Sequence, residues 1–71
     1  MTQKNRNNVI TKLNAVLAQI APFNRAFQYG MKIRLLNEVI YRLDNCYSDD
    51  NITDKRIEFV IGNVIYEKIM A

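Results

Sequence analysis

The sequence predicts an all-α protein, a small domain of three helices, and three observations lead to that prediction. Apolar residues recur at helical spacing through most of the chain. Pro22 and the polar run 48–53 interrupt that spacing. The length of 71 residues suits one domain and leaves no room for a second. We therefore expect a single domain over residues 1–71, with helices at roughly 6–21, 23–47 and 53–70.

The first predicted helix follows a polar N-terminal arm, residues 1–8, which forms at most a first helical turn. Beyond it the apolar side chains fall on one stripe with helical spacing. The members of this stripe are Val9, Leu13, Val16, Leu17 and Ile20. Pro22 either ends this helix or opens the next, because a proline disfavours helical geometry in the residue before it.

The second predicted helix carries a longer apolar stripe. Its members are Tyr29, Ile33, Leu36, Ile40, Leu43 and Tyr47, broadened by Leu35, Val39 and Cys46. Phe23, Ala26 and Phe27 lie away from this stripe when the chain is projected at about 100° per residue. Gly30 stands between the two registers, so we expect the helix to bend or break there.

The last segment has two alternatives, a helix or a β-hairpin. As a helix it begins after the turn 48–53, with Thr53 as its N-cap. As a hairpin it turns at Gly62-Asn63, between two β-branched runs. The hairpin pairing sets Glu58 opposite Glu67, which is unfavourable. We therefore favour the helix and keep two helices plus a C-terminal β-hairpin as the alternative fold.

The residue types argue against catalysis. The chain has no histidine, so neither a Ser-His nor a Cys-His nucleophile pair can form. Cys46 is the only cysteine, which leaves no intrachain disulfide and no complete zinc site. We expect it to be a small core residue. We therefore expect a protein that is not an enzyme and has no cofactor or metal.

Four acids near the predicted turn superficially suggest a cation site. They are Asp44, Asp49, Asp50 and Asp54. They lack the alternating ligand spacing, the central glycine and the terminal glutamate of a calcium loop. We expect a solvated turn with acids at the start of the third helix.

The cellular setting and origin are expectations from composition. A single cysteine and no signal peptide favour the cytoplasm. No apolar run reaches the roughly 18 residues that a membrane span needs. Nine isoleucines and nine asparagines fit an AT-rich gene, as in some bacteria, phages and plasmids.

The charges divide the chain into two halves. Residues 1–37 hold six Lys or Arg and no acid, whereas residues 38–71 hold all seven acids beside four Lys or Arg. Such asymmetry favours an anionic partner or an acidic protein surface. Phe27 and Tyr29 interleave with several of these cations, a pattern suited to phosphates and stacked bases. The alternative function is therefore a nucleic-acid-binding regulator, with candidate residues Lys12, Arg25, Lys32 and Arg34.

The function that we prefer is predicted from the third helix, because that helix carries two apolar stripes. The wider stripe is Ile57, Val60, Ile61, Val64 and Ile65, and we expect it to face the core. The other stripe, Phe59, Tyr66 and Met70, is then left outward, where a monomer would rarely expose it. We expect a small regulatory protein that acts by protein–protein contacts, as a homodimer or with another protein.

Overall fold

The structure, a computed structural model, describes residues 1–20 and 30–70, without the side chains of residues 69 and 70. Over this part of the chain all regular structure is helical, which confirms the predicted all-α three-helix fold. The elements are α1 (Gln3–Ile20), α2 (Met31–Cys46), the short 3-10 turn η3 (Asp49–Asn51) and α3 (Asp54–Met70). The alternative hairpin turning at Gly62-Asn63 is wrong, because one continuous helix runs through that position.

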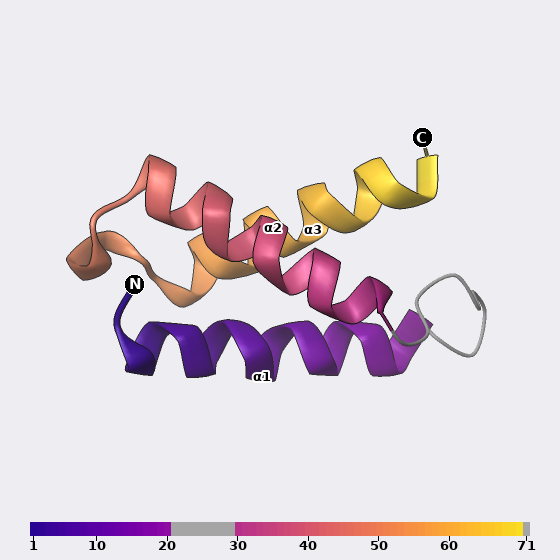
Figure 1. The fold of residues 1–71 in the computed structure, drawn as a ribbon, viewed down its shortest axis with the longest axis horizontal. Coiled ribbons are helices and arrows are strands. Elements are labelled where there is room, and N and C mark those ends of the chain that lie inside the picture. The colour runs from indigo at the N-terminus through magenta and orange to yellow at the C-terminus, as the bar shows by residue number, and fades with distance from the viewer. Residues whose placement is uncertain (21–29, 71) are drawn as a thin grey trace.

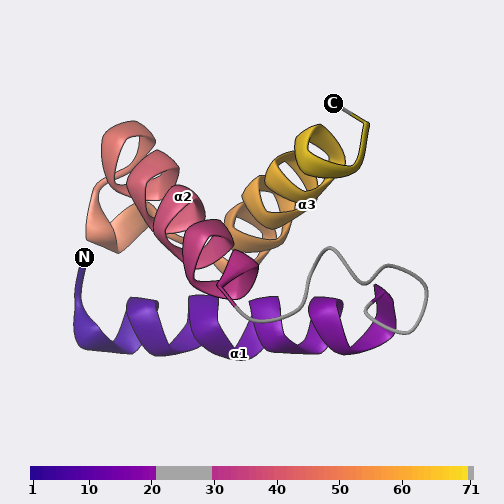
Figure 2. The same cartoon turned by 45° about the vertical axis from the view of Figure 1, so that its right-hand side comes forward.

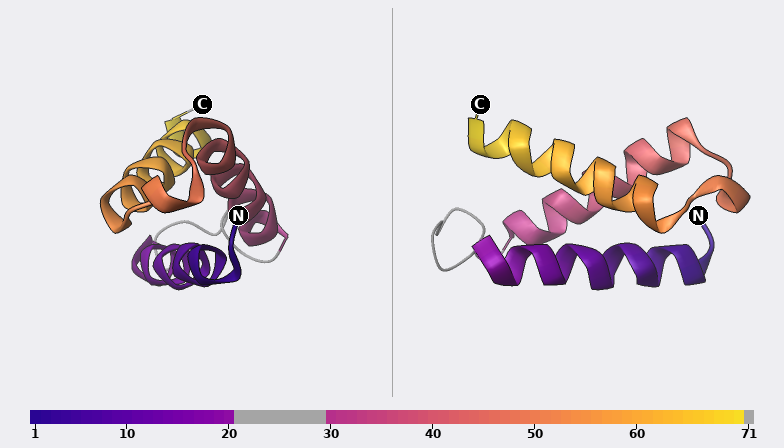
Figure 3. Two further views of the ribbon diagram at one scale, coloured as in Figure 1. Left: turned by 90° about the vertical axis from the view of Figure 1, so that its left-hand side faces the viewer. Right: turned by 180° about the vertical axis from the view of Figure 1, so that it is seen from behind.

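The helices are arranged with α1 along one side and the other two crossing above it (Figure 1). In Figure 2, α2 and α3 open away from α1 like the arms of a V. The end-on view of Figure 3 shows the three helices surrounding one central region. α2 packs against α3 more extensively than either packs against α1.

Each helix contributes one apolar face to a shared core. The buried residues are Val9, Leu13, Leu17, Leu35, Val39, Leu43, Ile52, Ile57, Val60, Ile61, Val64 and Ile65. Burial of a side chain of this size stabilises the fold by about 1.5–3 kcal/mol relative to exposure. The predicted core stripe of α3 is confirmed in full. The predicted stripe of α1 is also confirmed, with its remaining members Val16 and Ile20 half-buried against the core.

Helix α1 begins earlier than predicted. Residues 3–8, expected to be a polar arm or first turn, form the first two turns of α1. Thr2 explains this start, because its Oγ1 accepts a hydrogen bond from the backbone N–H of Asn5 at 3.2 Å. A threonine at this position satisfies a backbone donor that the first helical turn leaves without a partner.

Helix α2 begins at Met31, directly after Gly30, and the first part of the predicted helix, residues 23–29, lies outside the described residues. It buries only part of the predicted apolar stripe. Leu35, Val39 and Leu43 are fully buried, whereas Ile33 is 64% exposed. Cys46 is exposed too, so its prediction as a core residue is wrong.

The reason lies in the width of the apolar arc on α2. Apolar side chains cover about half the circumference of this helix when projected at 100° per residue. α1 and α3 cover only part of that arc, and Leu36 and Ile40 remain half-buried at its margin. Periodicity located the arc but could not choose the part that neighbouring helices bury.

Candidate functional site

Helix α3 carries the candidate interaction surface, and its start is fixed locally. Thr53 Oγ1 accepts a hydrogen bond from the backbone N–H of Arg56 at 3.3 Å, which confirms the predicted N-cap. Ile52 and Ile57 lie on either side of the cap and are both buried, as in a hydrophobic staple. These contacts determine where α3 begins.

With the wide stripe buried, the opposite side of α3 faces away from the other helices. Phe59 is 65% exposed and Tyr66 is 64% exposed. Gly62 and Asn63 lie between them and are also exposed. We call these four residues the outward face of α3. Met70 belongs to the same side by helical register, but its side chain lies outside the described part of the chain.

Ion pairs hold α3 on the side next to α1. Lys12 Nζ lies 3.1 Å from Glu58 Oε1 and 3.9 Å from Asp54 Oδ2. The contact with Glu58 joins residues 46 positions apart in the chain. Exposed pairs of this kind contribute about 0–1 kcal/mol each, so they fix orientation more than they add stability.

A second set of ion pairs holds α3 on the side next to α2. Arg42 donates to Glu38 Oε1 at 2.9 Å and also to Glu67. The hydrogen bond from Arg42 holds the pKa of Glu67 below its ordinary value. The same two carboxylates raise the pKa of Arg42, Glu67 more than Glu38. Both flanks of α3 thus form ion pairs with the neighbouring helices, whereas among the described residues the outward face takes part in none.

The basic residues predicted to bind nucleic acid are not gathered into one surface within the described residues. Lys12 belongs to α1, and its side chain forms ion pairs with two acids of α3. Lys32 and Arg34 are exposed on α2, but a separation of two residues turns them about 160° apart on a helix. Arg25 lies outside the described residues, as do the predicted stacking rings Phe27 and Tyr29.

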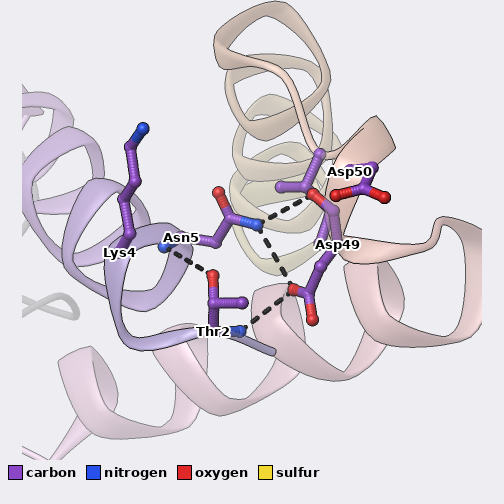
Figure 4. A pocket seen from close by; sticks show the side chains of 6 residues that line it. Thr2, Lys4, Asn5, Asp49 and Asp50 are labelled. Carbon is purple, nitrogen blue, oxygen red and sulfur yellow. Dashed lines mark hydrogen bonds between the residues drawn. The ribbon is translucent and has the colours of Figure 1, made fainter.

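A polar contact that the sequence did not predict joins η3 to the start of α1 (Figure 4). Asp49 accepts hydrogen bonds at its carboxylate from the backbone N–H of Thr2, at 3.0 Å, and from Asn5 Nδ2, at 3.3 Å. The Thr2 bond first, and the Asn5 bond second, lower the pKa of Asp49. Lys4, Asp50 and Ile52 complete a small open hollow around this contact.

This hollow is a structural junction. The sequence predicted only a solvated turn here, and no local signal could link Asp49 to residues more than forty positions away. Asp44, Asp50 and Asp54 are exposed, as that prediction implied. Among the described residues, no group of three or more His, Cys, Asp or Glu side chains is placed to hold a metal ion.

A second exposed apolar pair lies on α2 and was also missed. Ile33 is 64% exposed and Tyr41 is 65% exposed. Ile33 was expected in the core, and Tyr41 was given no role. Both side chains lie outside the part of α2 that α1 and α3 cover.

Comparison of the chain with protein-family models, curated proteins and solved structures gave no match. Among the described residues, every helix is too short or too polar to cross a bilayer. We therefore infer the function from the geometry of this molecule.

Proposed function

We propose that this chain is a small, non-catalytic regulatory protein that acts by protein–protein contacts and forms a homodimer through the outward face of α3. One observation carries the proposal: Phe59 and Tyr66, two large aromatic residues on one face of α3, are 65% and 64% exposed. Soluble monomers rarely leave such rings together in water. Aromatic residues of this size are the anchors that commonly dominate binding energy at interfaces.

The size of the protein supports the same proposal. A chain of 71 residues buries only about 60% of the surface that its unfolded form exposes, so its core is marginal. Self-association is one of the usual ways in which small domains gain further burial. Two-fold dimers are the commonest closed arrangement. With α3 covered by a second copy, Ile33 and Tyr41 on α2 are the apolar surface left for another protein.

The test measures the molecular mass in solution. Light scattering at micromolar concentration should give about twice the 8.3 kDa chain mass. The double variant Phe59→Asp, Tyr66→Asp should be a folded monomer with an unchanged far-UV circular dichroism spectrum. Tyr41→Asp is the matched control, because Tyr41 is equally exposed but lies on α2. It should remain dimeric.

Three results would contradict the proposal. A monomeric wild-type protein would remove the dimer. A double variant that unfolds would show that the two rings stabilise the fold itself. Dissociation by Tyr41→Asp alone would move the interface to α2.

The second candidate function is a nucleic-acid-binding regulator, and one observation favours it. Lys32 and Arg34 are exposed and, among the described residues, take part in no ion pair. Binding through phosphates would weaken steeply as salt rises. Replacing Arg25, Lys32 and Arg34 with Gln should then abolish binding to duplex DNA or RNA. Absence of any gel retardation of the wild-type protein at low salt would reject this candidate.

A further inference from the structure

Gly62 lies in the middle of α3, where the fold itself gives no reason for a glycine. Its backbone is helical, and a Cβ atom added there would meet nothing within 4 Å. Glycine forms helices less readily than any residue except proline, because it has the most backbone freedom to lose. An alanine would suit the described fold better, so the reason for Gly62 lies outside that fold.

The position of Gly62 relates it to the exposed rings. It follows Phe59 by three residues and precedes Tyr66 by four, so all three share one side of the helix. The two rings project from that side, and Gly62 leaves a gap between them. A gap of this kind lets the backbone of another helix approach closely, with the rings packed on either side of it.

The outward face is also nearly unchanged when its order is reversed. Phe59 lies three residues before Gly62, and Tyr66 lies three residues after Asn63. Two antiparallel copies of α3 can therefore be related by a two-fold axis between Gly62 and Asn63. This places Phe59 of each copy beside Tyr66 of the other and brings Gly62 and Asn63 of both copies together at the axis, so the face complements itself.

Charges on the flank next to α2 favour the same orientation. Arg56 lies near the N-terminal end of this flank, with its guanidinium carbon 4.5 Å from the centre of the Tyr47 ring. Glu67 lies near the C-terminal end. With Arg42 and Glu38 it forms a cluster of net negative charge. Antiparallel packing brings Arg56 of one copy towards Glu67 of the other, whereas parallel packing sets like charges together.

We propose that a second copy of this chain covers the outward face, with its own α3 crossing antiparallel at Gly62. The inference rests on the proposed homodimer and adds its orientation, its crossing point and the role of Gly62. Gly62 is the contact point that lets the two helix backbones approach, and Phe59 and Tyr66 pack around it.

The first experiment compares Gly62→Ala with the wild type by dilution and sedimentation. The added methyl group should favour the native helix, shifting the folding equilibrium about fivefold. It should nevertheless raise the dimer dissociation constant about tenfold or more, because it separates the two backbones. Asn14→Ala is the control, since Asn14 is exposed on α1, away from the outward face. It should leave the dissociation constant unchanged.

The second experiment locates the crossing with single cysteines in a Cys46→Ser background. Asn63→Cys should form a disulfide-linked dimer on oxidation, because the two copies of this position meet at the axis. Lys55→Cys should not, since its two copies lie about 22 Å apart along an antiparallel pair.

The results separate this inference from the proposed homodimer. A monomeric wild type would overturn both. A wild-type dimer that Phe59→Asp with Tyr66→Asp dissociates, but whose dissociation constant Gly62→Ala leaves unchanged, would overturn the crossing at Gly62 alone. Cross-linking at both Asn63→Cys and Lys55→Cys would replace the antiparallel orientation with a parallel one.

Discussion

Single polar residues link the three helices at the surface, around the apolar core. Lys12 bridges α1 to two acids of α3, and Arg42 bridges α2 to Glu67. Asp49 joins η3 to the first turn of α1. All three bridges are solvent-accessible, so each contributes little energy alone. The apolar core therefore supplies most of the stability, and these bridges add contacts between particular pairs of helices.

At this scale Thr53 offers the clearest energetic test. Replacement by alanine removes the side-chain acceptor for the Arg56 N–H, at 3.3 Å, and should destabilise the protein by about 1 kcal/mol. For a domain of this size that corresponds to a fall in melting temperature of about 4–8 °C. Thr53→Ser keeps the hydroxyl and should restore most of the loss in thermal denaturation. Equal destabilisation by both variants would contradict the capping role.

At the scale of elements, α2 takes part in the most extensive helix–helix contact, the one with α3, and also packs against α1. Val39 is fully buried in its middle. Val39→Pro removes a backbone hydrogen bond and clashes with the preceding turn, at a cost of about 3 kcal/mol or more, in addition to lost packing. The variant should lose most of its helical circular dichroism signal.

A matched proline at the start of α3 gives the control. Asp54 is the first residue of that helix, and its N–H would have no intrahelical acceptor in any case. Asp54→Pro should therefore keep the wild-type spectrum. Unfolding by both prolines would show only that the protein tolerates no proline in its helices.

The sequence predicted the buried side of a helix correctly where its apolar stripe is narrow or has polar residues on both sides. The stripe from Val9 to Ile20 fixed the buried side of α1, and the cap at Thr53 fixed the start of α3. On α2 the apolar arc is too wide, and the choice between Ile33 and Leu35 depends on where the neighbouring helices lie.

In the candidate site, the exposure of Phe59 and Tyr66 follows from the local pattern. The bridges of Lys12 and Asp49 do not, because they join distant parts of the chain.

The rotation of α2 can be tested with a pair of alanine substitutions. Leu35 is fully buried, so Leu35→Ala should lose about 2–5 kcal/mol of stability in urea denaturation. Ile33 is 64% exposed, so Ile33→Ala should change stability by no more than about 0.5 kcal/mol. The reverse order would restore the register predicted from periodicity alone.

At the scale of the whole molecule, the helices are joined by an apolar core and, at its edge, by hydrogen bonds to carboxylates. Within the described residues the centre holds no buried polar side chain. At the edge of the core, Asp49 joins η3 to the start of α1, and Glu67 joins α3 to α2. Hydrogen bonds hold the pKa of each carboxyl below its ordinary value.

The lowered pKa of these two carboxyls predicts how the stability of the fold depends on pH. The pKa of both carboxyls is lower in the folded state, so between the folded and unfolded pKa values the unfolded chain binds more protons. Their contribution is complete above the unfolded pKa of about 4, and it disappears as the pH falls through the folded pKa. Urea midpoints at fixed protein concentration should therefore decrease below about pH 4. A double variant, Asp49→Asn with Glu67→Gln, should be less stable than the wild type at pH 7, and the difference should narrow on acidification. A difference that stays constant would mean that these two carboxylates do not link the helices in solution.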